Sequence, residues 1–149
     1  MMKNIIIREI ETGDFPSLIE LFTEFAHFEK LPEKMVNSVE RMQNEKDWLN
    51  GFVATDDKGK IHGYATWFFA YYTWYGKSMY MDDLYVRHEF RGNGLGTKLI
   101  NSVISKAKET KCRKLRWQVS GWNEPAVEFY KKLGASVDPV ESNCDLILN

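Results

Sequence analysis

The first part of the chain has a strand-like apolar run followed by helix-like spacing of its apolar residues. Residues 5–10 predict a first strand. Asp14 is expected to be the N-cap of the next helix, with Pro16 in the first turn, where proline is tolerated. The apolar residues with helical spacing are Leu18, Leu21, Phe22, Phe25, Ala26 and Phe28. We expect Pro32 to end this helix and a more polar surface helix to span about residues 33–46.

The middle of the chain carries three strand signals separated by turns. A short strand is predicted for residues 51–55, and residues 56–59 form a hairpin turn. Residues 61–72 are rich in aromatic and β-branched side chains, which favours a strand. A second turn at residues 74–77 leads into a strand over residues 78–86. These segments predict three strands, of which the first two form a hairpin.

The last third of the chain begins with a glycine-rich loop that leads into a helix over about residues 94–110. The apolar stripe of this helix is Leu95, Leu99, Ile100, Val103, Ile104 and Ala107. Residues 113–120 alternate as a strand. Asn123 is a plausible N-cap for another helix, with Pro125 in its first turn and Gly134 as its C′ stop.

Two short strands, near Ser136 and over residues 145–148, are predicted to close the chain. The predicted order is therefore β-α-α-β-β-β-α-β-α-β-β. It describes an α/β fold with a mixed, mostly antiparallel central sheet flanked by helices. The length of 149 residues suits a single domain over residues 1–149.

The net charge and the cysteines limit the expected partners and the expected cellular compartment. The net charge of −1, with acids and bases interspersed, argues against a nucleic acid or a membrane as partner. Cys112 and Cys144 form no metal-binding spacing, so we interpret them as small buried residues in a reducing, cytoplasmic protein. No signal peptide or membrane span is expected. His27, His62 and His88 are isolated, so no metal site is predicted.

The segment with the most chemical information is the loop Arg91-Gly92-Asn93-Gly94-Leu95-Gly96, between a strand and a helix. Backbone N–H groups in such a loop, together with the helix N-terminus, can bind a phosphate or pyrophosphate. The glycines do not fit the dinucleotide or P-loop patterns. The alternative is a turn that uses glycine only for its backbone geometry.

Two motifs together resemble the GNAT acetyltransferase superfamily. Residues 91–96 match its R/Q-x-x-G-x-G/A signature, and residues 122–135 are similar to its N-x-x-A-x-x-F-Y-x-x-x-G segment. Residues 25–29, 74–77 and 79–86 resemble the diamine and spermidine/spermine acetyltransferases in particular. The resemblance covers nearly the whole chain and implies acetyl-coenzyme A as co-substrate, transfer to an amine and a homodimer.

The resemblance also implies the residues that bind coenzyme A. The loop would hold the pyrophosphate, backbone amides of the preceding strand would meet pantetheine and the thioester, and Asn123 would bind near the pantetheine arm. The expected set is Leu84, Tyr85, Val86, Arg91, Gly92, Asn93, Gly94, Leu95, Gly96, Thr97, Asn123, Ala126, Tyr130 and Lys132. For Lys132, a solvated position at the helix end is the alternative.

Transfer requires a neutral amine and a protonated leaving group. An alkyl ammonium has a pKa near ~10.4, so a carboxylate must take its proton, directly or through water. By resemblance, Asp82 is the base and Asp83 holds the cation; strand alternation would put them on opposite faces. The alternative is that they only cap or pair near a strand end. Tyr130 is expected to protonate the departing thiolate, the alternative being a half-buried aromatic residue.

The substrate side of the site is where the resemblance weakens. Glu29 matches a substrate-binding glutamate, and Tyr72, Trp74 and Trp122 are candidate walls for a cationic substrate. Tyr72 stands where the polyamine enzymes carry an aspartate. We therefore expect a small primary amine, such as a diamine or a thialysine-like amino acid. Acetylation of a protein N-terminus or lysine, and a non-catalytic acyl-CoA-binding module, are the alternatives.

Overall fold

The computed structural model describes residues 4–148, and the chain divides into two compact units. The first unit ends at Trp117 and the second begins at Gln118. The first carries the sheet and most of the helices, and the second carries one further helix.

The sheet of the first unit has five strands in the order β1-β2-β3-β4-β5. The strands are β1 (Ile6–Glu9), β2 (Asn50–Thr55), β3 (Ile61–Tyr72), β4 (Gly76–Val86) and β5 (Leu115–Arg116). The first four pair antiparallel with their neighbours, and β5 pairs parallel to β4. The predicted mixed, mostly antiparallel sheet is confirmed, although β5 is much shorter than residues 113–120.

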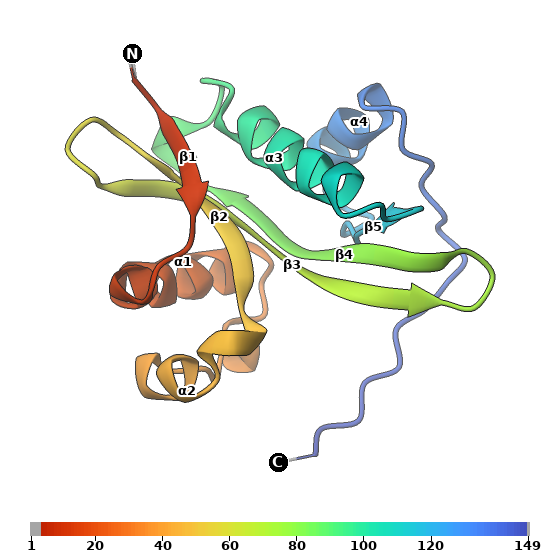
Figure 1. Cartoon of the computed structure of the whole chain (residues 1–149), viewed down its shortest axis with the longest axis horizontal. Helices are drawn as coiled ribbons and strands as arrows, with labels where there is room; N and C mark the ends of the chain where they lie inside the picture. The colour runs from red at the N-terminus through yellow and green to blue at the C-terminus, as the bar shows by residue number, and fades with distance from the viewer. Residues whose placement is uncertain (1–3, 149) are drawn as a thin grey trace. The chain divides into compact units, whose positions relative to one another are not determined.

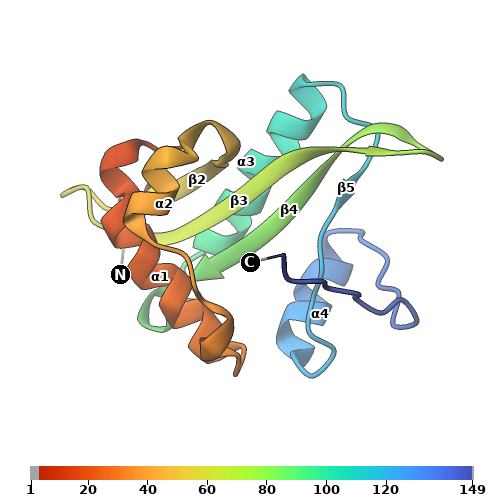
Figure 2. The same ribbon diagram turned by 90° about the horizontal axis from the view of Figure 1, so that it is seen from below.

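Helices cover both faces of this sheet (Figures 1 and 2). Helices α1 (Phe15–Phe28) and α2 (Val39–Asn44) lie on one face, and α3 (Leu95–Glu109) lies on the other. Four 3-10 turns complete the unit: η1 (Thr12–Asp14), η2 (Pro32–Lys34), η3 (Lys46–Trp48) and η4 (His88–Phe90). Of the described helices, none is both long and apolar enough to cross a bilayer.

The core forms where the apolar stripes of the helices meet the sheet. Leu18 and Leu21 of α1 are fully buried against Val53 and Tyr64 of the sheet. On the other face, α3 buries Leu99 and neighbouring apolar residues, as its spacing predicts. Burying a side chain such as leucine stabilises the fold by roughly 1.5–3 kcal/mol.

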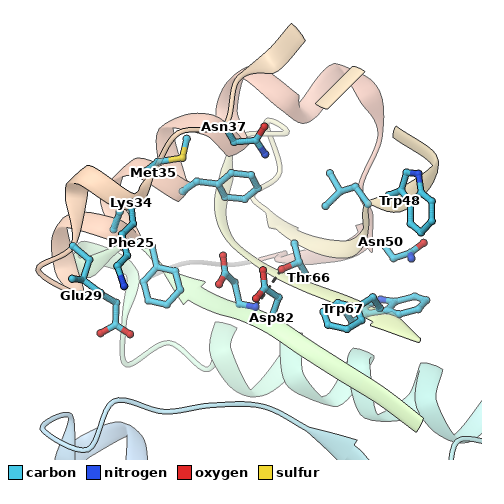
Figure 3. A pocket seen from close by; sticks show the side chains of 16 residues that line it. Phe25, Glu29, Lys34, Met35, Asn37, Trp48, Asn50, Thr66, Trp67 and Asp82 are labelled. Carbon is cyan, nitrogen blue, oxygen red and sulfur yellow. Dashed lines mark hydrogen bonds between the residues drawn. The ribbon is translucent and has the colours of Figure 1, made fainter. Parts of the chain in front are cut away.

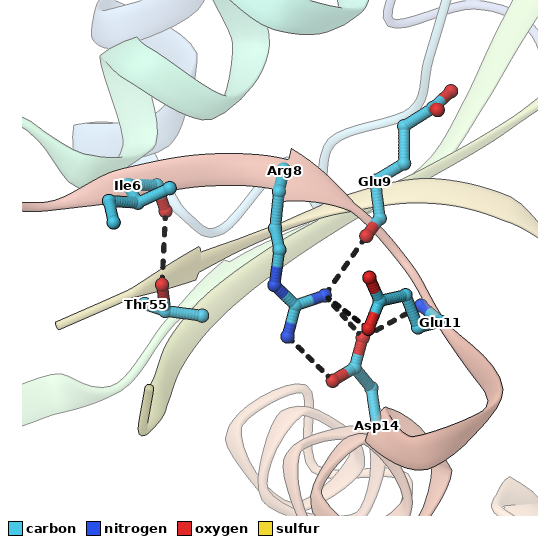
Figure 4. A network of polar contacts seen from close by, with 6 residues as sticks. All are labelled: Ile6, Arg8, Glu9, Glu11, Asp14 and Thr55. Carbon is cyan, nitrogen blue, oxygen red and sulfur yellow. Dashed lines mark hydrogen bonds and ion pairs between the residues drawn. The ribbon is translucent and has the colours of Figure 1, made fainter. Parts of the chain in front are cut away.

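Asp14 occupies the N-cap position of α1, but its side chain does not cap that helix (Figure 4). Both carboxylate oxygens accept hydrogen bonds of 2.8 Å from the Arg8 guanidinium, and one also accepts the backbone N–H of Glu11. The predicted N-cap position is confirmed, but the side-chain capping bond is absent, because Asp14 already has helical dihedrals (φ −82°, ψ −15°) whereas a capping residue is extended.

The two N-terminal helices are shorter than predicted. Helix α1 ends at Phe28, before Pro32, and Lys30 then adopts a left-handed conformation with φ of 64°. The polar helix begins only at Val39, because Ser38 caps it by accepting the Arg41 N–H at 3.1 Å. Capping residues thus set the helix bounds here more closely than periodicity does.

A β-bulge interrupts the pairing of β3 with β4. Thr66 lies opposite Asp83 and Trp67 lies opposite Met81, so Asp82 is the extra residue on β4. A bulge breaks the strict alternation of side chains between the two faces of a sheet. The expectation that Asp82 and Asp83 point to opposite faces is therefore wrong.

The second unit contains α4 (Glu124–Lys132). Asn123 caps it as predicted, its Oδ1 accepting the Ala126 N–H at 3.4 Å, and Gly134 ends it with φ of 94°. The two closing strands predicted near Ser136 and over residues 145–148 are not formed in the described chain. Within residues 118–148 no other strand is available to satisfy their backbone groups.

Candidate active site

An open pocket of about 480 Å³ lies in the first unit, beside the bulge (Figure 3). Its walls combine apolar side chains with three acidic groups and one lysine. The lining residues are Phe22, Phe25, Ala26, Glu29, Leu31, Lys34, Met35, Asn37, Trp48, Leu49, Asn50, Thr66, Trp67, Phe68, Asp82 and Asp83. An apolar pocket with a few polar groups is typical of a small-molecule site.

The bulge brings both aspartates of β4 into this pocket. In a regular strand one of them would face α3; here Asp82 and Asp83 both line the cavity on the α1 side. The two negative charges repel each other, and Glu29 at the end of α1 adds a third negative charge near Asp83. The pocket is therefore suited to a cation.

Asp83 is the more tightly held of the two aspartates. The Tyr64 hydroxyl donates a 2.8 Å hydrogen bond to its Oδ2, and its backbone N–H donates to Thr66 Oγ1 at 3.2 Å. Burial, followed by the charges of Asp82 and Glu29, raises the pKa of Asp83 to about 7, although the Tyr64 bond acts in the opposite direction. Partial burial also raises the pKa of Asp82, whose side chain is more exposed.

The two ends of the pocket differ in character (Figure 3). Glu29 and Lys34 lie at one end, and Trp48, Asn50 and Trp67 lie at the other. Asn50 and Trp67 are direct cross-strand neighbours. The Trp67 Nε1 is buried and has no hydrogen-bond partner among the residues that the structure describes.

Two expected substrate-binding residues of the first unit lie outside this pocket. The ring of Tyr72 lies below the side-chain cations of Lys114 and Arg116, at 4.6 and 4.5 Å. Trp74 is 94% exposed in the β3–β4 turn. The structure thus brings Glu29 to the two aspartates but leaves Tyr72 and Trp74 elsewhere on the β3–β4 hairpin.

Sequence reasoning missed Tyr64 and Thr66. Regular pairing continued from Trp67 and Met81 would put Thr66 opposite Asp82, leaving Asp83 on the other face. The bulge shifts the register by one residue, so that Asp83 faces Thr66 and meets Tyr64 diagonally. No motif in the sequence marks this bulge.

The glycine loop has the geometry of an anion site. Gly92 and Gly94 both have φ of 81°, and the space where their side chains would lie is open. Helix α3 begins at Leu95, whose buried side chain anchors the loop to the core. The first-turn amides, including those of Gly96 and Thr97, have no acceptor within the helix. They favour a negatively charged group.

The two polar side chains of the loop shape its backbone. Arg91 donates from Nε to the Val86 carbonyl at 2.9 Å, and its guanidinium lies 4.7 Å from the centre of the Phe28 ring. Asn93 donates to the carbonyl of Phe90 at 3.1 Å. These contacts hold the loop beside the end of β4 before any ligand binds.

The end of β4 presents backbone donors away from β3. The N–H groups of Asp83 and Arg87 both point toward β3, where they bond Thr66 and the His62 carbonyl. Because donors alternate along a strand, the N–H groups of Leu84 and Val86 point to the opposite edge. The pairing of β4 with β5 stops at Tyr80, so beyond this residue β5 no longer pairs with this edge of β4. The ring of Tyr85 instead packs in the core.

The remaining predicted site residues belong to the second unit. Tyr130 is 8% exposed, and its ring centre lies 5.4 Å from that of Phe129. Asn123 and Ala126 form the capping bond of α4. Trp122 is half-exposed just before this helix, and Lys132 is exposed at its end.

Comparison with known proteins gives a consistent result. Residues 8–135 match the model of the acetyltransferase (GNAT) family. The chain is 34% identical over 145 residues to thialysine N-epsilon-acetyltransferase of Sus scrofa, covering 90% of this chain and 85% of that protein. It is 30% identical to a D-amino-acid N-acetyltransferase of Saccharomyces cerevisiae, covering 91% and 88% of the two chains.

A solved structure has the same fold. The aminoglycoside acetyltransferase meta-AAC0020 from an uncultured soil metagenomic sample superposes with a TM-score of 0.80, at 22% identity and with coverage of 96% and 97% of the two chains. With the family match over most of its length, the chain belongs to the GNAT family and is an N-acetyltransferase.

Proposed function

We propose that the protein transfers an acetyl group from acetyl-coenzyme A to a small primary amine. The observation that carries this proposal is the pair of carboxylates, Asp82 and Asp83, which the bulge turns into one pocket beside the end of β4. A cationic amine bound there would have a proton acceptor within the pocket. The relatives named for thialysine and for D-amino acids support an amine of this size.

Acetyl-coenzyme A suits the glycine loop and the backbone amides at the end of β4. The amides of the α3 N-terminus and the open space at Gly92 and Gly94 suit a pyrophosphate. The outward N–H groups of Leu84 and Val86 suit pantetheine and the thioester carbonyl. We assign the same co-substrate to Arg91, Asn93, Leu95, Gly96 and Thr97 of the loop, to the backbone of Tyr85, and to Asn123, Ala126, Tyr130 and Lys132 of the second unit.

The proposed reaction is direct transfer with two protein groups moving protons. A carboxylate of the aspartate pair takes a proton from the ammonium, and the free amine attacks the thioester carbonyl. The thiolate of coenzyme A leaves and receives a proton from Tyr130. Glu29 supplies a further negative charge for the substrate cation. Tyr72, Trp74 and Trp122 stay candidates for contacts with the part of the amine outside the pocket.

The test is steady-state transfer with a panel of amines, followed by release of the coenzyme A thiol. The panel contains diamines, spermidine, thialysine, ornithine, D-amino acids and a lysine-containing peptide. We expect turnover with small primary amines and little with the peptide. Acetyl-coenzyme A binding without turnover on any amine would contradict the proposal and favour a non-catalytic module. Preference for the peptide would favour a protein acetyltransferase.

We also propose that the protein is a homodimer. The β3–β4 hairpin exposes the aromatic side chains of Phe68, Phe69, Tyr71, Trp74 and Tyr75, and large exposed apolar surface favours association. Size-exclusion chromatography with light scattering should give twice the chain mass of 17.5 kDa. A monomer at micromolar concentration would contradict this expectation.

A further inference from the structure

We propose that Asp83, rather than Asp82, takes the proton from the substrate ammonium, and that Tyr64 is a positioning residue that holds the Asp83 carboxylate. This inference rests on the proposed acetyl transfer to an amine and deepens it. It starts from an asymmetry between two adjacent carboxylates that share one pocket.

The two carboxylate oxygens of Asp83 have different surroundings. Tyr64 is fully buried, and its hydroxyl bonds only one oxygen of the carboxylate, Oδ2. Among residues 4–148, no hydrogen bond reaches Oδ1, so this oxygen is left for a ligand in the pocket. Thr66 fixes the backbone of Asp83 through the bond from its N–H. Asp83 is thus held at its backbone by Thr66 and at one carboxylate oxygen by Tyr64.

Several polar and charged groups face Asp83 and set its proton affinity. Asp82 from β4 and Glu29 from the end of α1 raise its proton affinity, as does burial, whereas the Tyr64 hydroxyl from β3 lowers it. Lys34 is the cationic side chain in the pocket lining. The balance leaves the pKa of Asp83 at about 7, the range in which a general base works best at neutral pH.

Asp82 is suited to a different role, that of binding the substrate cation. Its side chain is more exposed than that of Asp83 and makes no hydrogen bond to a tyrosine within residues 4–148, so water can stabilise its charge. An ionised Asp82 beside the ammonium holds the substrate, and it keeps the neighbouring carboxyl basic. Two adjacent carboxylates with different surroundings thereby acquire different roles.

The proposed transfer releases one proton for each amine acetylated. One proton passes from the substrate ammonium to Oδ1 of Asp83, which later releases it to solvent. The amine lone pair forms the C–N bond, and the C–S bond of the thioester breaks. The second nitrogen proton leaves as the amide forms, and it replaces the one that Tyr130 gives to the coenzyme A sulfur. The products are the acetamide, coenzyme A thiol and one released proton.

Tyr64→Phe tests the inference because it removes only the hydroxyl. Burial raises the pKa of Tyr64 well above its usual value, so the residue stays a donor throughout the assay range. Without its bond, the Asp83 carboxylate is less stable, and its pKa rises. We expect the acid limb of kcat/KM against pH to move up by about one unit. The defect should be roughly tenfold at pH 6.5 and should nearly disappear by pH 9.

A loss of packing would lower the rate equally at every pH, and this outcome would overturn the positioning role. Ser105→Ala, which removes a hydroxyl from the exposed face of α3, is the control and should leave the profile unchanged. If Tyr64→Phe does not fold, a carboxyl ¹³C NMR titration of the wild-type protein decides instead. The Asp83 signal, assigned with Asp83→Asn, should titrate near neutral pH, and titration near pH 4 would overturn the inference.

These outcomes are separable from failure of the proposed function. If the wild-type protein acetylates none of the amines, the function proposal fails, and the NMR titration still tests the Asp83–Tyr64 pair. If wild-type turnover is normal and the profile of Tyr64→Phe does not move, the inference fails alone.

Discussion

Asp83→Asn is expected to lower kcat/KM for the amine by roughly 10²–10³-fold at pH 7.5. Asparagine has nearly the same shape and can still accept the Tyr64 hydrogen bond, but it cannot take a proton. The substitution therefore removes the proposed base and leaves the pocket intact. Steady-state kinetics with the best amine of the panel measure the effect.

The same substitution is expected to stabilise the protein at alkaline pH. The pKa of Asp83 is raised from 3.8 to about 7 in the folded protein, so between these values the folded chain binds a proton that the unfolded chain does not. The wild-type free energy of unfolding must then fall as the pH rises from about 4 to about 7. Asparagine carries no such charge. We expect Asp83→Asn to be more stable by roughly 1–3 kcal/mol at pH 8, with little gain at pH 4.

Asp82→Asn is the matched control for both effects. Its loss of charge should raise KM for the amine more than it lowers kcat, because Asp82 is assigned to hold the cation. It should also give the smaller gain in stability, since its side chain is more exposed. Urea unfolding at pH 4, 6 and 8 separates the variants. A larger kcat loss in Asp82→Asn than in Asp83→Asn would return the role of base to Asp82.

The sequence predicted best those parts of the fold in which local signals and burial agree. The apolar stripe of α3, the glycine loop before it and the capping of α4 by Asn123 all follow from short-range patterns. Each depends on residues within one or two helical turns, so no knowledge of distant contacts is needed. The β3–β4 hairpin is also predictable from the sequence, because its strands are long and rich in residues that favour strands.

The failures share a different physical cause, since each depends on a partner distant in the chain or in space. Asp14 has the residue type of a helix cap, but Arg8 binds its carboxylate. The closing strands have apolar residues, yet a strand forms only where a neighbour accepts its backbone bonds. The bulge at Asp82 is the decisive case. One inserted residue changed which carboxylate meets Tyr64, and strand alternation cannot reveal it.

Tyr130→Phe is expected to lower kcat by roughly 10²–10³-fold while changing KM for acetyl-coenzyme A by less than about threefold. Tyr130 is nearly buried and packs against Phe129, and phenylalanine keeps this packing. Only the hydroxyl is lost, and with it the proposed proton donor to the coenzyme A thiolate. Because the proton is needed only as the C–S bond breaks, the loss should appear in kcat and not in binding.

Two measurements distinguish this role from a structural one. Calorimetric titration with acetyl-coenzyme A should give similar affinities for the variant and the wild-type protein. The Ser105→Ala control should match the wild type in both binding and rate. Tyr130→Phe acts at the leaving group, so it should lower kcat across the pH range, unlike Tyr64→Phe, whose defect should fade above the pKa of Asp83. A variant that retains wild-type kcat would remove Tyr130 as the acid and would mean that the thiolate leaves unprotonated or takes its proton from water.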